Sequence, residues 1–449
     1  MPETTHPQLP PCDHQPHHYD GPTYDEALRL RQEFINPGIF HYYKEPLMLV
    51  EGRMQYVWDH TGKRYLDGFG GIVTVSVGHC HPEVVDALTN QAGRIQHAPT
   101  IYLHPTIGQF AEKLASTLPP KLKRVYFVNS GSEANDIAVL MARLHTGNYD
   151  VIALRNCYHG GNAMGMGLTS HHTWKYNVPL GFGIHHARAP YPYRGDFGHD
   201  DPDAGKKYAA DVEDLIRFAT PGKVAAFIAE PIQGVGGTVE FPDDYLREVY
   251  PMIQKAGGVT ISDEVQTGFG RTGSAFWGFE NHGIEPDIVV MAKSIGNGFP
   301  LAAVVTTDEI AETLQGRIHF NTFGGDPLAM AQGLKTLEIM LRDDTQKLCQ
   351  RIGDRILKGL RKLAESHSII GEVRGRGLMI GAELVKAPIT KEPAAAEAAH
   401  IVERARELGL IIGKGGLHGN VLRIKPPMCL TEEDADFLLE VIGQILGEM

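Results

Sequence analysis

An alternation of short apolar runs with stretches of helical periodicity is the feature that most constrains this fold. The helical stretches, such as 133–145 and 244–256, carry their apolar residues on one stripe. Apolar runs this short and continuous are typical of strands covered on both faces, and they lie at 125–128, 151–154, 224–229, 259–262 and 288–291. Strands and helices in alternation predict an α/β fold with a large domain built on a mostly parallel sheet and a smaller α+β domain.

The same patterns divide the 449 residues into segments. A short helix at 24–34 and a strand pair at 55–58 and 64–67 indicate a peripheral layer before the sheet begins. Helices and short strands after the long helix that begins at Pro327 indicate a separate C-terminal unit. We expect a tail at 1–20, a segment at 21–80 that contributes to the small domain, a large domain at 81–335 and a small domain at 336–449.

The tail holds four histidines in a proline-rich context. Their spacing matches no set of metal ligands, so a flexible, solvated tail is favoured over a metal-binding arm, and no metal site is expected elsewhere. These histidines are His6, His14, His17 and His18.

Charge and cysteine usage exclude several classes of protein. The net charge of −12 has the wrong sign for gripping nucleic acid or anionic membrane surfaces. Five scattered cysteines form neither a disulfide framework nor a zinc site, which fits a reducing compartment. No apolar run approaches the ~18 residues of a membrane span, and the first 20 residues resemble neither a signal peptide nor a transit peptide. We expect a bacterial-type cytoplasmic protein, with a mature chain of the mitochondrial matrix as the alternative.

The first predicted strand of the sheet is followed by a possible anion site. The sequence Asn129-Ser-Gly-Ser-Glu133 leads directly into a helix, whose free N–H groups can bind a phosphate. Gly131 permits close approach of the backbone. Ser130 and Glu133 also have the spacing of a helix capping box, and this motif alone does not decide between the two interpretations.

Polar and aromatic residues follow three further strands. Tyr158 and His159 come after 151–154, Glu230 after 224–229, and Asp263 with Glu264 after 259–262. An aromatic residue in such a position is often an ordinary buried side chain, and a single carboxylate is often solvated. A cluster of carboxylates after such apolar strands is less easily explained, because burying each one is costly without a partner.

Lys293 emerges directly from the last predicted strand, 288–291. Most lysines are solvated, but desolvation lowers the pKa of an amine and lets it act as a Schiff-base nucleophile and then as a general base. A phosphate seat, a stacking ring, a carboxylate and a lysine at one sheet edge match the needs of pyridoxal 5'-phosphate, a planar, anionic, basic aldehyde.

Several motifs together resemble the class III, fold-type I aminotransferases from about Phe34 to the C-terminus. In the family's order they are SGSEAN at 130–135, YHG at 158–160, AEP at 229–231, DEVQTGFGR at 263–271, Lys293 and NTFGG at 321–325. Three further segments look most like the alanine-glyoxylate aminotransferase type 2 group within this family: 71–82, 232–236 and 373–380.

The resemblance implies a role for each matching residue around the cofactor ring. Lys293 would form the Schiff base and Asp263 would keep the pyridine nitrogen protonated, so these two are the expected catalytic residues. Gln266 would bind the phenolic oxygen. Tyr158 and Val265 would sandwich the ring, and His159 and Glu230 would complete this part of the cofactor site.

The resemblance also implies roles at the phosphate and at the substrate. Gly131 and Ser132 would bind the phosphate, and Thr322 would reach the phosphate of a neighbouring subunit. We therefore expect a homodimer, or a dimer of dimers, with shared active sites. Arg423, within NVLRIK at 420–425, would bind the substrate carboxylate with its bidentate fork.

The expected activity is ping-pong transfer of an amino group from alanine or a related amino acid, ω-amino acids included, to glyoxylate or pyruvate. Another ω-aminotransferase, or an aminomutase or decarboxylase of the same fold, is the alternative. A nicotinamide-dependent oxidoreductase, suggested by Gly413, Gly415 and Gly419, is disfavoured because their spacing is wrong and a strand-like segment follows them. A protein that only binds metabolites would not need the lysine and the carboxylate.

Overall fold

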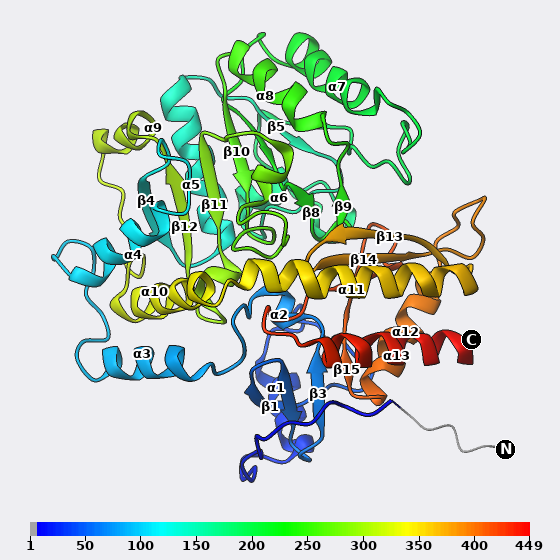
Figure 1. Ribbon diagram of the computed structural model, residues 1–449. Helices are drawn as coiled ribbons and strands as arrows, with labels where there is room; N and C mark the ends of the chain where they lie inside the picture. The colour runs from blue at the N-terminus through cyan, green and yellow to red at the C-terminus, as the bar shows by residue number, and fades with distance from the viewer. Residues whose placement is uncertain (1–6) are drawn as a thin grey trace.

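A seven-stranded sheet forms the centre of the protein. The computed structural model describes residues 7–449, and Figure 1 shows the sheet with helices packed around it. All neighbouring strands are parallel except β12, which is antiparallel to both β11 and β4. The expected α/β fold with a mostly parallel sheet is confirmed. In spatial order the strands are β4 (Arg124–Val128), β12 (Ala302–Thr306), β11 (Ile288–Met291), β10 (Val259–Asp263), β7 (Ala226–Ala229), β5 (Val151–Leu154) and β6 (Ile184–Ala187).

Two strands of this sheet go beyond the five predicted ones. β6 lies at an edge, and two half-buried histidines, His185 and His186, interrupt its apolar character. β12 follows β11 after only a short connection and turns back antiparallel. An expectation of strictly alternating strands and helices has no place for such a strand.

The central sheet contributes side chains to two hydrophobic cores, because successive residues of a strand point to opposite faces of the sheet. In β11, Ile288 and Val290 pack in one cluster, whereas Val289 and Met291 pack in the other. The helices that cover the first face are α5 (Gly131–Thr146), α7 (Ala204–Ala219) and α8 (Tyr245–Lys255). Those that cover the second face are α4 (Pro105–Ala115) and α10 (Pro327–Arg342).

A four-stranded sheet below the central one joins the two ends of the chain (Figure 1). Its first three strands form an antiparallel meander, and β15, from near the C-terminus, adds in parallel to β3. The order is β1 (Leu49–Arg53), β2 (Tyr56–Asp59), β3 (Arg64–Asp67) and β15 (Leu410–Ile411), preceded by α1 (Tyr24–Phe34).

The segment from residue 7 to residue 20 lies along this sheet in irregular conformation. The Arg64 guanidinium donates to the carbonyl of Pro10 at 2.6 Å, and the His14 ring is 2.6 Å from a carboxylate oxygen of Glu51 and packs on Trp58. Where the sequence predicts a flexible, solvated tail at 1–20, these contacts fix the course of its second part, because proline prevents secondary structure but not packing. Residues 1–6, His6 included, lie outside the described residues.

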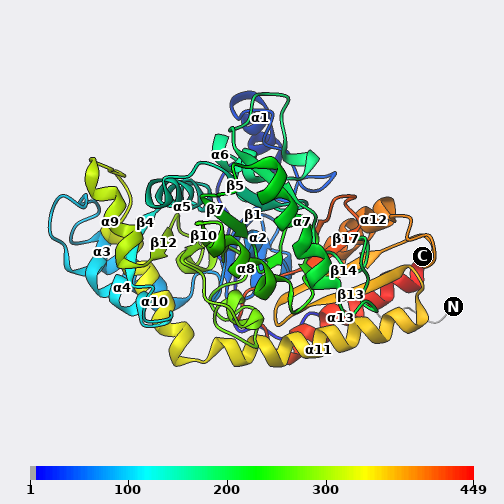
Figure 2. The ribbon, with the colours of Figure 1, turned by 90° about the horizontal axis from the view of Figure 1, so that it is seen from above.

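The C-terminal part is an antiparallel sheet covered by long helices. Figure 2 shows α11 along one side of the molecule, where it packs against β13 and α13. Its sheet has the order β13 (Ile370–Arg376), β14 (Met379–Leu384), β17 (Val421–Ile424) and β16 (Gly413–Gly415). The helices are α11 (Thr345–Ser366), α12 (Ala395–Glu407) and α13 (Glu432–Glu448).

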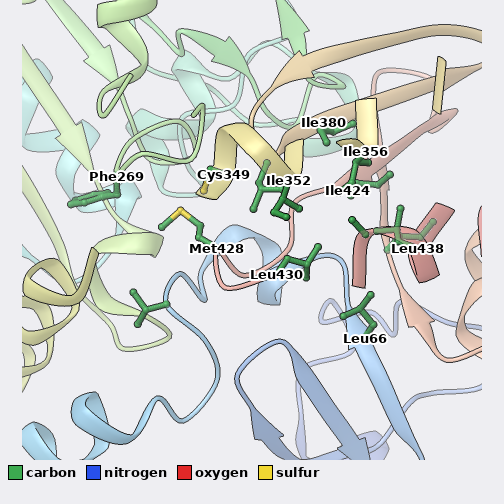
Figure 3. Close-up of a cluster of buried hydrophobic side chains, with 14 of the residues drawn as sticks. Leu66, Phe269, Cys349, Ile352, Ile356, Ile380, Ile424, Met428, Leu430 and Leu438 are labelled. Carbon is green, nitrogen blue, oxygen red and sulfur yellow. The ribbon is translucent and has the colours of Figure 1, made fainter. Parts of the chain in front are cut away.

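One continuous core joins this part to the rest of the protein. Figure 3 shows Ile352 of α11, Ile424 of β17 and Leu438 of α13 in the same cluster as Leu66 of β3 and Phe269, which follows β10. All five side chains are almost completely buried. The predicted boundaries at residues 80 and 335 therefore lie within shared packing, and they stay predictions.

A buried arginine ties the central sheet to the C-terminal sheet. Arg271, in the segment after β10, donates from one guanidinium nitrogen to the carbonyls of Leu378 at 3.3 Å and Pro426 at 2.8 Å. Burial lowers its pKa to about 10. The segment that follows Asp263 is thus held against the segment that follows β17.

The remaining elements are short and connect these layers. They are α2 (Gly70–Val73), α3 (Pro82–Ala92), α6 (Ala163–Leu168), η1 (His172–Trp174), β8 (Ile232–Gln233), β9 (Val239–Glu240), η2 (Gly278–His282), η3 (Lys293–Gly296), α9 (Asp308–Glu312) and η4 (Thr313–Gly316).

No helix within residues 7–449 is long and apolar enough to cross a membrane.

Candidate active site

A cavity of about 410 Å³ lies where β4, β5, β7, β10 and β11 end. The ends of parallel strands meet at one sheet edge, so residues that are distant in sequence share this cavity. The site residues predicted from the sequence that line it are Gly131, Ser132, Tyr158, His159, Glu230, Asp263, Val265, Gln266 and Lys293.

Lys293 follows β11 in a strained backbone conformation. Its φ of 52° lies in the left-handed region, which a side chain with a Cβ rarely adopts. Such strain persists only where the surroundings enforce it, and it is concentrated at functional sites. Burial lowers the pKa of the Lys293 amine to about 8, although Asp263 and Glu230 act in the opposite direction. A substantial fraction of this amine is neutral near pH 8 and can act as a nucleophile.

Asp263 is an ionised carboxylate in the protein interior. The ring Nδ1 of His159 lies 2.7 Å from its Oδ2, and the Asn135 amide donates to the same oxygen at 2.9 Å. The backbone N–H of Val265 donates to Oδ1 at 3.1 Å. Burial alone would raise the pKa of Asp263, but these hydrogen bonds and the charge of His159 hold it below its usual value.

His159 is the protonated partner of that carboxylate. Burial favours its neutral form, but the Cys157 sulfur and the Asp263 carboxylate outweigh burial and raise its pKa well above 6.5. Its other ring nitrogen, Nε2, is buried without a hydrogen-bond partner in the described structure. A histidine held in this way keeps Asp263 charged and fixes its orientation.

Glu230 is held by the backbone. Its two carboxylate oxygens accept hydrogen bonds from the N–H of Tyr158 at 3.0 Å and of Gly234 at 2.7 Å. Burial is the largest influence on Glu230 and raises its pKa. This carboxylate therefore joins the ends of β5 and β7 and fixes the backbone beneath the Tyr158 ring.

The start of α5 is capped and also borders the cavity. The Ser130 hydroxyl accepts from the N–H of Glu133 at 3.2 Å and caps the helix. The Glu133 side chain accepts from the N–H of Asn129 at 2.7 Å and not from that of Ser130, so only half of the capping box forms. Gly131 and Ser132 nevertheless line the cavity at the helix N-terminus. The cap thus fixes a helix end that presents N–H groups to an anion.

The loop after β5, which contains Gly160 and Gly161, leaves little room around Ser132. The Ser132 hydroxyl accepts from the N–H of Gly161 at 3.1 Å. A Cβ on Gly160, whose φ is 129°, would lie 2.5 Å from the same hydroxyl oxygen. Glycine at 160 therefore lets the segment after β5 close over the helix N-terminus.

Gln266 contacts two basic side chains, Arg423 in β17 and Lys425 directly after it. The Arg423 guanidinium and the Lys425 amine each lie 3.2 Å from its Oε1. Arg423 is only 4% exposed, its Nε has no partner in the described structure, and burial lowers its pKa to about 10. An arginine buried in this way is ready to receive a carboxylate.

Thr322 and Arg423 are the two predicted site residues that do not line the cavity. Thr322 is exposed in the segment between η4 and α10. Arg423 donates to Gln266, which does line the cavity.

Sequence reasoning missed two residues that organise the site. Asn135 bridges Asp263 and the carbonyl of His159, and it stands at the end of the SGSEAN motif without having been assigned a role. Lys425 lies two residues after Arg423, a spacing that puts both on the same face of a strand. This spacing is the sequence signal that could have placed Lys425 next to Arg423. The cavity wall is completed by Thr74, Asn129, Ser130, Gly160, Ala292, Gly298, Phe299, Pro300 and Leu301.

The groups in the cavity fit pyridoxal phosphate. The α5 N-terminus suits its phosphate, the ionised Asp263 suits a protonated ring nitrogen, and the amine of Lys293 suits its aldehyde. Asp263 Oδ2 is already saturated by His159 and Asn135, whereas Oδ1 accepts only one backbone N–H. That oxygen therefore has capacity for one more donor.

Comparisons with known proteins agree with this chemistry. Residues 41–446 match the family described as aminotransferase class-III. A mitochondrial protein of Arabidopsis thaliana named alanine-glyoxylate aminotransferase 2 homolog 2 is 51% identical over 442 residues, 98% of this chain and 91% of that protein.

Two solved structures share the fold over nearly their whole length. A phospholyase from Arthrobacter in complex with phosphoethanolamine has a TM-score of 0.89 at 36% identity, covering 94% of this chain and all of that one. An amine transaminase from an uncultivated Pseudomonas species in its PLP-bound form has a TM-score of 0.87 at 30% identity, covering 93% and 98% of the two chains.

The pKa of Lys293 predicts how cofactor-stripped protein recombines with pyridoxal phosphate. Only the neutral amine attacks an aldehyde, so the recombination rate should rise about tenfold per pH unit below pH 8 and level off above it. Stopped-flow absorbance at several pH values measures this profile. A rate that still climbs steeply to pH 10 would mean an ordinary lysine, and Lys293→Ala is the control for non-specific reaction.

Proposed function

We propose that this chain, which belongs to the class III aminotransferase family, uses alanine or a related amino acid as donor and glyoxylate or pyruvate as acceptor. It is a pyridoxal phosphate-dependent aminotransferase. The observation that carries the substrate proposal is the buried Arg423, whose Nε has no hydrogen-bond partner among residues 7–449. The name of the Arabidopsis relative supports alanine and glyoxylate in particular.

Lys293 would hold the cofactor and then move a proton. When bound, pyridoxal phosphate supplies an aldehyde that captures an amine and a ring that accepts the electron pair of a breaking Cα–H bond. The Lys293 amine, once a donor amine replaces it, would act as general base at the substrate carbon and return the proton as general acid. Its lowered pKa, about 8, suits both directions of transfer.

Asp263 would keep a proton on the ring nitrogen. A carboxylate beside a pyridine nitrogen favours its protonated form, because opposite charges stabilise each other strongly in the interior. His159 and Asn135 would preserve the charge of Asp263 during turnover, since both donate to the oxygen that the ring does not need.

The other cavity residues would orient the cofactor. Tyr158 and Val265 would contact the two faces of the ring, and Gln266 would donate to the phenolic oxygen. Glu230 would support the backbone beside the ring. Gly131 and Ser132 would bind the phosphate at the start of α5, with Thr322 from a neighbouring subunit.

Arg423 would bind the carboxylate of the substrate. A guanidinium forms two parallel hydrogen bonds with a carboxylate, which fixes the substrate relative to the Lys293 amine. In the structure Arg423 contacts the Gln266 oxygen and the Phe69 ring, 5.4 Å from its centre, and no ion pair joins it to a carboxylate among the described residues.

A homodimer, or a dimer of dimers, would complete the site. Leu103 and Ile318 are almost fully exposed, and exposed apolar clusters of this kind mark protein interfaces. The His97 ring packs on Phe323, so the two segments that carry this cluster are neighbours. The exposed apolar cluster consists of Ile95, Ile101, Tyr102, Leu103, Ile318, Phe320 and Phe323.

The cytoplasmic location expected from the first 20 residues stays a prediction. The mitochondrial matrix is its alternative, and the Arabidopsis relative carries "mitochondrial" in its name.

Borohydride trapping tests the covalent link to Lys293. Reduction of the loaded protein followed by peptide mass mapping should place the cofactor on Lys293, and Lys293→Ala should lose both the label and all turnover of alanine with glyoxylate. Lys335→Ala, a change in a half-buried lysine of α10 that does not line the cavity, serves as the control. A label on another residue, or normal turnover in Lys293→Ala, would refute the assignment.

Arg423 should discriminate donors by their carboxylate. Because two charge-assisted hydrogen bonds are lost, Arg423→Met should lower kcat/KM for alanine by about 100-fold. Isopropylamine, in which a methyl group replaces that carboxylate, should be affected far less. Steady-state rates with both amines, and analysis of the products, measure the difference. An equal loss with both amines would contradict the proposed role.

Charges placed in the exposed apolar cluster should separate the subunits. Light scattering should give at least two chains per particle for the wild-type protein, and Leu103→Asp combined with Ile318→Asp should give one chain with greatly reduced activity. Ile389→Asp changes another fully exposed apolar residue, on the C-terminal part, and should leave the assembly intact. A monomeric wild-type protein with full activity would exclude shared sites.

A further inference from the structure

Lys425 is a fully buried lysine beside the active site. Its relative exposure is 0%. Lysine is almost never fully buried unless it is paired, because its charged form loses hydration. No ion pair joins Lys425 to a carboxylate among residues 7–449, and its contacts are two uncharged oxygens. Because burying an unpaired lysine costs hydration free energy, we expect Lys425 to have a role in the site.

The hydrogen bonds of Lys425 match those of a neutral amine. Its Nζ donates to the carbonyl of Gly234 at 3.3 Å and to Gln266 Oε1 at 3.2 Å. A neutral amine has two N–H groups, and these two acceptors use both. Burial, with Arg423 nearby, lowers the pKa of Lys425 well below 10.5, in agreement with this count.

These contacts decide which way the Gln266 amide faces. Lys425 and Arg423 each approach the same end of the amide at 3.2 Å, and the Arg423 guanidinium carries only donors. That end must therefore be the carbonyl oxygen. The amide also lies close against Gly234, where a Cβ would be 2.4 Å from its carbon. The NH2 group is consequently left to face the cavity that Gln266 lines.

Arg423 alone would be an unreliable anchor for this amide. Under the proposed function, Arg423 engages the substrate carboxylate, and a carboxylate competes strongly with an amide oxygen for a guanidinium. Lys425 has no access to solvent, and its other hydrogen bond goes to the carbonyl of Gly234, which does not compete for Gln266. It can hold Gln266 in both states of Arg423.

We propose that Lys425 is a positioning residue that fixes the Gln266 amide with its NH2 toward the cofactor while Arg423 binds the substrate carboxylate. This inference rests on the proposed roles of Gln266 and Arg423. It assigns to Lys425 the maintenance of one hydrogen bond to the cofactor's phenolic oxygen. Removing Lys425 should therefore resemble removing Gln266.

The test compares Lys425→Met, Gln266→Ala and their combination. Two readouts are independent of turnover: the dissociation constant of cofactor-stripped protein for pyridoxal phosphate, and the pH at which the visible absorption of the bound cofactor changes. Loss of one hydrogen bond should weaken binding about three- to tenfold in Lys425→Met. The pH of the absorption change should rise, because a donor to the phenolic oxygen stabilises its deprotonated form.

The combination of variants separates positioning from general stability. If Lys425 acts through Gln266, Lys425→Met adds nothing in the Gln266→Ala background. Lys425→Gln keeps an N–H donor and should recover part of the affinity. It also replaces Lys425→Met in the cycle if the methionine variant does not fold, as judged by thermal unfolding. Lys414→Met removes a lysine from the neighbouring strand β16 and should behave as wild type.

Two outcomes would overturn the inference. One is unchanged binding and absorption in both Lys425 variants, and the other is a full additional effect in the Gln266→Ala background. Borohydride labelling of wild-type Lys293 is measured on the same preparations. Failure of that labelling refutes the proposed function, whereas normal labelling with additive variants refutes only the role of Lys425.

Discussion

The ionised carboxylate of Asp263 is the constraint on which the rest of the site depends. A carboxylate in a protein interior keeps its charge only where donors replace the lost water. His159 and Asn135 supply such donors at 2.7 and 2.9 Å, from the segment after β5 and from α5. Because these residues converge only when β4, β5 and β10 share one sheet, the charge state of Asp263 reports the correct assembly of the fold. The same packing provides hydrogen bonds to Asp263 and Glu230, and no ion pair joins Lys293 or Arg423 to a carboxylate within residues 7–449, so the site is prepared for anionic ligands.

Much of this arrangement follows from the sequence because it depends on local patterns. Five apolar runs predict five strands of the central sheet, and residues within a few positions after each run reach the cavity, as Lys293 and Asp263 illustrate. The antiparallel strand β12 and the edge strand β6 were not predicted, because their place in the sheet depends on neighbouring strands rather than on their own periodicity. The roles of Asn135 and Lys425 were not predicted for a related reason. Asn135 acts on Asp263 and Lys425 acts on Gln266, and a single sequence does not reveal such pairs of side chains.

The separate parts of the chain act as one packed body. The cluster in Figure 3 runs from Leu66 to Leu438, and Arg271 bonds the segment after β10 to carbonyls of the C-terminal part. Gln266 contacts Arg423 and Lys425 across the same junction. Gln266, which lines the cavity, and Arg423 are therefore held relative to each other by the shared core and these hydrogen bonds.

The pairing of β3 with β15 has a consequence for biosynthesis. The two strands lie near opposite ends of the chain, yet Leu66 donates its N–H to the carbonyl of Gly409 at 2.8 Å. A ribosome releases β3 long before its partner has been translated. Throughout that interval the strand exposes unpaired backbone groups, which can pair with strands of other nascent chains. This edge of β3 therefore stays open to such pairing until residues 410–411 have been made.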